Sequence, residues 1–395
     1  MRRLSADDVW DQVSMREYDV LFTLSLAPSS SLRLHDLNRE ILLSQPSLSR
    51  LVERLEGEVM TGGRMDDMSN LEAQPVEQEC EGHPAESEIQ ILTPRDVPLG
   101  GPRAMRVRRT LPQRERSLIG GWCFADHYGP DDVGSGPGMH VPPHPHTGLQ
   151  TVSWLFTGEI EHRDSIGSHA MVRPGELNLM TAGSGIAHSE VSTPNTKVLH
   201  GMQLWVALPD AARDTAPAFV HYRPEPVTTD GVTLSVFLGS LAGETSPVST
   251  FTELLGAEVI LDPGAEIALD VDRSHEHGVI VDQGSVVLRG TTVGWAELGY
   301  QAPGFGKLTL RNPGSEPARL LLLGGKPLGE QVIMWWNFMG RTHEEIVEYR
   351  RKWQAELASG FDGSVPDRRF GVVPGYDGPA LPAPELPNST LRPRG

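Results

Sequence analysis

The chain has 395 residues and a net charge of −18, with 34 Lys and Arg against 52 Asp and Glu. This acidity argues against a large surface for nucleic acid or anionic membranes, and the length predicts two or three domains. No apolar run reaches the ~18–20 residues that a membrane span needs, so no membrane association is expected. With only two cysteines, Cys80 and Cys123, and no apolar leader after Met1, the chain is expected in the reducing cytoplasm.

Residues 1–56 have the periodicity of short helices, and Ser44 is placed to cap the helix that runs to about Leu55. The stretches 18–21 and 42–55 resemble the helix-turn-helix of MarR-type winged-helix regulators, but the resemblance stops at Glu56, before any wing strands. Residues 1–60 carry seven basic and ten acidic residues, a balance of −3 that suits phosphate contacts poorly. We expect a truncated helical segment without specific DNA binding; a DNA-binding regulator is the alternative.

Residues 57–88 are rich in Gly, Met, Asp and Glu and hold little apolar material to bury. Such a composition predicts a disordered acidic linker.

From residue 89 onward the sequence consists of short apolar runs separated by Pro-Gly turns. The runs predict strands, which we place at 149–156, 177–180, 199–208, 257–261, 278–281, 286–288, 308–310 and 320–323. Because the pattern occurs twice, we expect a mainly β protein with two tandem jelly-roll β-barrels, at 89–225 and 226–341. Thr342 and Glu345 form a capping-box pattern that opens a helix over 342–358. The Pro/Gly-rich tail 359–395 is expected to lie on the surface.

Two pairs of metal-ligand residues stand out, each with a spacing of two. His144 and His146 form the first pair, and His188 and Glu190 form the second. Residues i and i+2 of a strand point to the same face, so each pair can aim at one point. If the two strands face each other, three imidazoles and one carboxylate converge. This donor set predicts a mononuclear metal site of mixed nitrogen and oxygen character in the first barrel.

The motifs around these pairs resemble those of the pirin family. They include the stretches 144–148, 161–165, 167–169, 173–177, 180–186 and 188–190 in the first block, and 321–328 and 336–338 in the second. The resemblance covers about 89–358. It implies two cupin domains, with one mononuclear Fe²⁺ in the N-terminal cupin. Carried over by motif, the iron ligands are the same four residues: His144, His146, His188 and Glu190.

The resemblance also implies a function. Some pirins resemble quercetin 2,3-dioxygenases, so a flavonol and dioxygen are the expected substrates, with Glu190 as the catalytic base that accepts the substrate hydroxyl proton. The alternative is a non-enzymatic regulator whose iron redox state controls binding to a transcriptional or metabolic partner protein. Both functions need the same four ligands, so the sequence leaves the choice open.

Further polar residues are expected beside the ligands. Pirins often carry a Glu four residues after the second His, where this chain has Gln150. Gln150, His140 and His162 are the candidates for the layer behind the metal ligands. A further pair, His275 and His277, lies in the second block without a second ligand pair to complete it, so we expect no second metal there.

Overall fold

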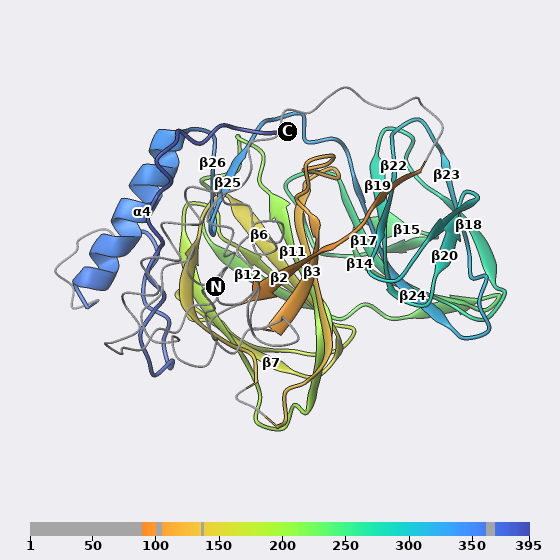
Figure 1. Ribbon diagram of the computed structural model, residues 1–395, viewed down its shortest axis with the longest axis horizontal. Helices are drawn as coiled ribbons and strands as arrows, with labels where there is room; N and C mark the ends of the chain where they lie inside the picture. The colour runs from red at the N-terminus through yellow and green to blue at the C-terminus, as the bar shows by residue number, and fades with distance from the viewer. Residues whose placement is uncertain (1–88, 100–104, 136–137, 361–367) are drawn as a thin grey trace, which may run out of the picture.

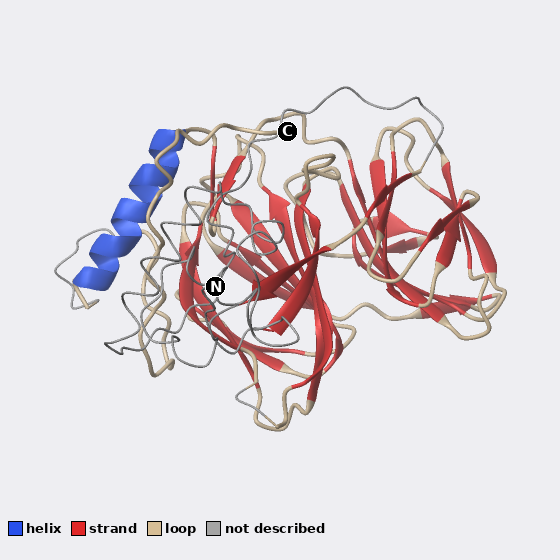
Figure 2. Cartoon of the chain, viewed as in Figure 1, coloured by secondary structure: helices blue, strands red, loops and turns tan. Residues whose placement is uncertain are grey.

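The computed structural model describes residues 89–99, 105–135, 138–360 and 368–395. In this part of the chain the protein is built almost entirely of β-strands, arranged as two barrels side by side (Figures 1 and 2). The expected helical segment 1–56 and linker 57–88 lie outside the described residues. The mainly β architecture with two jelly-roll barrels confirms the fold class predicted for the rest of the chain.

Two sheets form the first barrel. The larger has the spatial order β12 (Ala218–Tyr222), β9 (Leu177–Thr181), β6 (Leu149–Thr157), β11 (Val198–Ala207), β4 (Trp122–Asp132), β3 (Met105–Leu111), β2 (Arg95–Leu99). The smaller has the order β5 (His140–His146), β10 (Ile186–Ser192), β7 (Ile160–Asp164), β8 (His169–Val172). Both sheets are antiparallel throughout, which matches the short connections and frequent Gly turns of the sequence.

The second barrel repeats this plan. Its larger sheet has the order β1 (Gln90–Leu92), β22 (Leu298–Gln301), β19 (Glu276–Gln283), β24 (Ala318–Gly325), β17 (Leu254–Leu261), β14 (Val232–Leu238), β13 (Val227–Thr229). Its smaller sheet has the order β18 (Glu266–Asp270), β23 (Lys307–Arg311), β20 (Val286–Leu288), β21 (Thr291–Val293). A short hairpin, β15 (Ser240–Leu241) with β16 (Glu244–Thr245), lies beside it.

A shared apolar core joins the barrels. Trp122 and Trp154 from the first barrel are fully buried in one cluster with Phe237 and Ile280 from the second. The Trp154 ring stacks on Phe237 at 4.5 Å between centroids, and its indole N–H donates to Glu258 at 2.7 Å. Because this seam is large and apolar, the barrels are expected to behave as one body.

The chain crosses between the barrels more often than the sequence suggests. We expected residues 89–92 in the first barrel, but β1 pairs with β22 of the second. We also placed residues up to 341 in the second barrel. Instead β25 (Ile333–Trp335) and β26 (Phe338–Gly340) return to the first, where Phe338 bridges to Thr147. Aromatic side chains explain the return, because Trp335, Trp336 and Phe338 are buried in the core of the first barrel.

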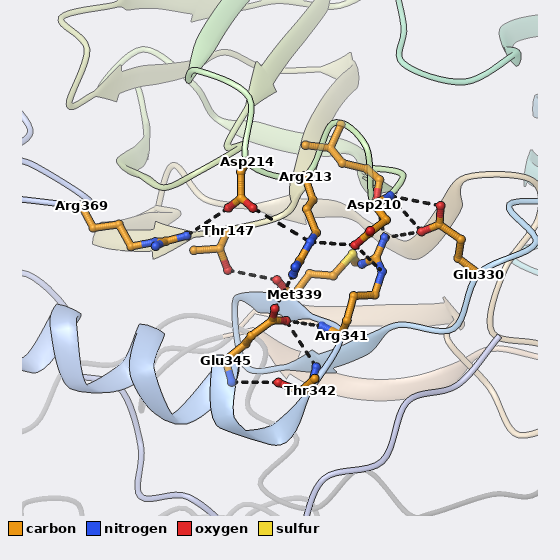
Figure 3. A network of polar contacts seen from close by, with 11 residues as sticks. Thr147, Asp210, Arg213, Asp214, Glu330, Met339, Arg341, Thr342, Glu345 and Arg369 are labelled. Carbon is orange, nitrogen blue, oxygen red and sulfur yellow. Dashed lines mark hydrogen bonds and ion pairs between the residues drawn. The ribbon is translucent and has the colours of Figure 1, made fainter.

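The predicted helix is present as α4 (His343–Ala358) and begins with the predicted capping box between Thr342 and Glu345. Figure 3 shows how its first turn is tied to the first barrel. The Arg213 side chain, from the segment between β11 and β12, contacts the Glu345 carboxylate at 2.7 Å, and Arg341 contacts Glu330 at 2.6 Å. The helix therefore lies against the first barrel, at the side away from the second (Figure 1).

The expectation that the tail after α4 only lies on the surface is wrong for its described part. Phe370, Val373 and Leu381 are buried in the same core as the helix residue Trp353. The Trp353 indole N–H donates to the Leu381 carbonyl at 2.7 Å. Apolar residues spaced among the prolines thus hold the tail in place, although its composition resembles that of a loose linker.

No helix among the described residues is long and apolar enough to cross a membrane.

Candidate metal centre

The two predicted ligand pairs lie on adjacent strands of the smaller sheet in the first barrel. Strand β5 carries His144 and His146, and β10 carries His188 and Glu190. The antiparallel register sets His188 directly opposite His144, and Ile186 opposite His146. The side chains on these positions share one face, so the three imidazoles converge as the spacing predicts.

Two features fix the backbone of these strands. Gly183 and Gly185 adopt φ values of +51° and +151° just before β10, and a Cβ at Gly183 would lie 2.0 Å from the Thr215 carbonyl oxygen. The tail also bonds to both ligand strands from outside. The Leu381 N–H donates to the Pro143 carbonyl at 2.8 Å, and the Phe370 carbonyl accepts from the Ala187 N–H at 3.1 Å. Each bond is made one residue before a histidine of the site.

The three imidazoles are buried and present their nitrogens to one another. One ring nitrogen of each of His144, His146 and His188 lies within 4.8 Å of the other two, and all three residues are at most 4% exposed. The Nε2 atoms of His146 and His188 are 3.0 Å apart. His144 donates from Nδ1 to the Pro142 carbonyl at 2.9 Å, so its neutral form keeps a free lone pair on Nε2.

Burial controls the charge of this cluster. Loss of solvation lowers the pKa of His144 to about 4 and lowers the pKa of His146 and His188 well below the ordinary value. Neighbouring imidazoles lower the values further, because each would repel a second positive charge. All three rings are therefore neutral at physiological pH, which is the form that binds a metal.

Glu190 lies beside His188, in a second cluster that overlaps the first. A register shift between His188 and Glu190 along β5 leaves Glu190 opposite Val141, while on the other side of β10 it pairs with His162 of β7. The ligand atoms of His162, His188 and Glu190 all lie within 4.8 Å of one another. His188 thus belongs to both clusters. The four predicted ligands do not meet at one point as expected, but form two groups that share His188.

The surroundings of Glu190 raise the pKa of its carboxyl group above the ordinary value. Burial raises the pKa of its carboxyl, although His162 and a hydrogen bond from Ser153 act in the opposite direction. The Ser153 hydroxyl lies 3.2 Å from Glu190 Oε1 and 2.9 Å from Gln203 Oε1. Tyr128 is also buried here, and burial together with the Glu190 charge raises its pKa well above the usual range.

The sequence analysis missed Ser153, Gln203 and Tyr128 as members of the site. They come from β6, β11 and β4 of the larger sheet, whereas the ligand pairs lie on β5 and β10 of the smaller sheet. The available signal was strand alternation. A small polar residue at every second position of an apolar strand, such as Ser153, indicates a polar barrel interior.

Two of the residues expected behind the ligands lie elsewhere. Gln150 has the opposite parity to Ser153 on β6, so it faces the side where Val152 and Trp154 pack, and its amide donates to Thr181 at 2.8 Å. His140 is exposed at the start of β5 and contacts the Tyr376 hydroxyl at 2.5 Å. Only His162 lies against the ligand cluster, with its Nδ1 3.4 Å from Nδ1 of His188.

A second buried group of polar residues joins the two barrels. Asp282 on β19 contacts His127 at 2.7 Å and His200 at 2.6 Å through Oδ1, and Arg319 at 2.6 Å through Oδ2. Its hydrogen-bonding potential is met by these three partners, so the group serves as a polar link within the seam. Sequence spacing gave no sign of it, because its residues come from β4, β11, β19 and β24.

The residues of the first barrel fit a divalent metal. Three neutral imidazoles whose ring nitrogens lie within 4.8 Å of one another can each turn a lone pair toward a cation placed between them. Imidazole nitrogens with a nearby carboxylate suit iron and the later transition metals. His144, His146 and His188 are the residues that could hold such an ion, and Glu190 lies beside His188 in the neighbouring cluster.

Comparison with known proteins agrees with this architecture. The Pirin family model matches residues 104–206, and that of the Pirin C-terminal cupin domain matches residues 256–358. A Pseudomonas aeruginosa protein that carries the provisional name quercetin 2,3-dioxygenase is 41% identical over 76% of this chain and 91% of its own length. A pirin-like protein of Caulobacter vibrioides is 35% identical over 63% of this chain and 88% of its own length.

Solved structures agree as well. The crystal structure of a quercetin 2,3-dioxygenase from Acinetobacter baumannii superposes with a TM-score of 0.70 at 35% identity, covering 77% of this chain and 97% of that one. Both barrels, the paired histidines and the relatives lead to the same conclusion: the chain is a two-cupin protein that belongs to the pirin family.

Proposed function

We propose that this protein is a metal-dependent dioxygenase that oxidises a flavonol such as quercetin, with one iron held by His144, His146, His188 and Glu190. The observation that carries the proposal is the group of three buried, neutral imidazoles beside a carboxyl group inside the first barrel. Relatives with quercetin 2,3-dioxygenase in their names, at 41% and 35% identity, support the choice of substrate. Bound iron would supply the redox chemistry that couples a flavonol to dioxygen.

The protein's own residues would then manage the substrate proton. A general base works best when its pKa lies near the operating pH, and burial moves the pKa of Glu190 upward in that direction. Its carboxylate is suited to accept the proton of the flavonol hydroxyl. The Ser153 hydroxyl, 3.2 Å away, holds the Glu190 side chain in position and bonds to the form that carries the charge.

The barrel would also exclude water from the reaction. His146 lies edge-on to the Trp205 ring at 5.3 Å, and the His162 ring stacks on Phe219 at 4.6 Å. These aromatic rings give the site apolar walls suited to a planar aromatic substrate.

Loss of the visible absorption band of quercetin, in air, by the iron-loaded full-length protein tests the proposal. We expect turnover by the wild type and a loss of about 100-fold or more in kcat for Glu190→Gln, the range expected for removal of a general base. Glu161→Gln is the matched control, because Glu161 is on β7 but pairs with Arg163 and His169 at the surface. An iron-loaded wild type that leaves quercetin intact would refute the dioxygenase and favour the metal-dependent regulator.

A further inference from the structure

The second barrel contains a cavity that the proposed function does not use. Its volume is about 830 Å³, which is within the range of small-molecule sites. Much of its wall is apolar and includes Leu241, Leu254 and Leu255, all nearly buried, together with Pro327 and Leu328. The lining residues come from β17 and from the segments that flank β15, β18 and β19, so the cavity is separate from the metal centre on β5 and β10.

His277 lies at the inner wall of this cavity. The residue is 1% exposed, and neither of its ring nitrogens has a hydrogen-bond partner among the described residues. Loss of solvation lowers its pKa to about 4, with a further contribution from His275, so the ring is neutral at physiological pH. A neutral imidazole offers one N–H donor and one lone pair. Both are left unused by the described part of the protein.

Two further buried polar side chains nearby also lack hydrogen-bond partners among the described residues. Gln301 on β22 is directly opposite His277 on β19, and it too is 1% exposed. Within the described ranges, neither atom of its amide has a partner, nor does the hydroxyl of Thr252, which lines the cavity. An unpaired buried polar group destabilises the fold, because it has lost its hydrogen bonds to water and gained none within the protein. Two of these groups, on His277 and Thr252, belong to residues that line the cavity, and an occupant that makes hydrogen bonds explains them most directly.

The charge at the mouth of the cavity restricts the class of occupant. Glu253, Asp270 and Asp272 line the mouth, against Lys326 as the one cation of fixed charge among the lining residues. The Glu253 and Asp270 side chains are 64% and 85% exposed. This acidic rim disfavours carboxylates and phosphates.

A metal ion is a poorer occupant than a small organic molecule. Glu253, Asp272 and His275 could offer three ligand atoms, but they lie at the exposed mouth and already bond within the protein. His275 contacts Glu253 at 3.1 Å, and Asp272 accepts from Ser274 at 2.7 Å. His277, the residue that lacks partners, is not part of that group.

We propose that the second barrel binds a small neutral molecule with an apolar body and a hydroxyl group, of which phenols are the simplest example. The hydroxyl group bonds to His277 and Thr252, which can each donate and accept. The apolar body packs on the leucine wall formed by Leu241, Leu254 and Leu255. This site is independent of the metal centre and of the proposed dioxygenase activity.

Ligand-observed ¹⁹F NMR of 4-fluorophenol with the full-length protein tests this assignment. We expect saturable line broadening, and binding at least tenfold weaker for His277→Phe, which fills a similar volume but cannot make hydrogen bonds. 4-Fluorobenzoate and fluorobenzene are matched probes that add a charge or remove the hydroxyl group, and each is expected to bind at least tenfold more weakly than 4-fluorophenol.

Two further variants keep the test decisive. Thr252→Val preserves the shape of the side chain, so it is expected to fold even if His277→Phe does not. Because it lacks the hydroxyl group, it is expected to bind 4-fluorophenol at least threefold more weakly. His188→Ala disrupts the first barrel's imidazole cluster and is expected to leave 4-fluorophenol binding unchanged. Broadening that survives both His277→Phe and Thr252→Val, or that disappears only in His188→Ala, would overturn the proposal.

Discussion

The buried carboxylate of Asp282 is expected to make a large contribution to the stability of the two-barrel unit. It is 2% exposed and receives three hydrogen bonds of 2.6 to 2.7 Å, two from the first barrel and one from the second. Asp282→Asn removes the charge and turns an amide N–H toward one of these donors. Breaking a buried ionic group by removing one partner costs about 3–5 kcal/mol, so we expect a loss of this size in the free energy of unfolding.

Urea unfolding at pH 7, followed by tryptophan fluorescence, measures this loss. Asp270→Asn is the matched control, because Asp270 is on the same barrel and pairs with Lys307 at 3.1 Å, but both side chains are largely exposed. An exposed pair contributes about 0–1 kcal/mol, so the control should unfold close to the wild type. A value for Asp282→Asn within 1 kcal/mol of the control would refute the reasoning.

Comparison of the wild type with Asp282→Asn at different pH values gives a second test. Hydrogen bonds from His127 and His200 outweigh desolvation and hold the pKa of Asp282 below its ordinary value in the folded state. A carboxyl group whose pKa is lowered by folding stabilises the protein fully above its unfolded pKa of about 3.9, and this contribution is lost as the pH falls toward the folded pKa. The difference between wild type and Asp282→Asn should therefore not narrow from pH 8 to pH 5. A difference that disappears by pH 5 would contradict the assigned role.

Three further predictions concern the first barrel and its cover. Gln150→Glu should change quercetin turnover less than about twofold, because the side chain faces away from Ser153. The variant should have a lower melting temperature, because it buries an unpaired carboxylate. A large gain in turnover would place Gln150 in the reaction. Trp353→Ala should cost about 3–5 kcal/mol in urea unfolding, whereas Val347→Ala, at a side chain 37% exposed, should cost under about 0.5 kcal/mol. Removing residues 359–395 should lower metal content at a fixed iron concentration, since the tail bonds beside both ligand strands; unchanged occupancy would show that the strands hold their own shape.

The histidines of the first barrel could be predicted because strand alternation is a local property. His144 and His146 share a face wherever that strand lies, and the antiparallel register then places His188 opposite His144. The relation of Glu190 to them could not be predicted. A bulge in β5 changes its neighbour to Val141, and bulges leave no reliable trace in a single sequence.

The alternation of side chains along a strand also explains why the predicted position of Gln150 behind the metal ligands was wrong. The resemblance to pirins, which often carry a Glu at this place, suggested that Gln150 lies near the metal, but a turn at Gly148, with φ of +68°, separates β5 from β6 and resets the faces. Long-range pairing is the other limit. The addition of β1 to the second barrel, and the burial of Phe370 under α4, depend on contacts between segments more than a dozen residues apart. The tail was predicted to lie on the surface because it is rich in Pro and Gly. Composition alone does not take account of how the apolar residues are spaced among the prolines.

The central claim is that the first barrel holds one metal ion on its three buried imidazoles. Elemental analysis of iron-reconstituted protein after gel filtration measures it directly, with His188→Ala as the test variant and His169→Ala, whose side chain is 47% exposed, as the control. We predict one iron per chain for the wild type and for His169→Ala, and almost none for His188→Ala. Full iron content in His188→Ala, or none in the wild type, would contradict the account.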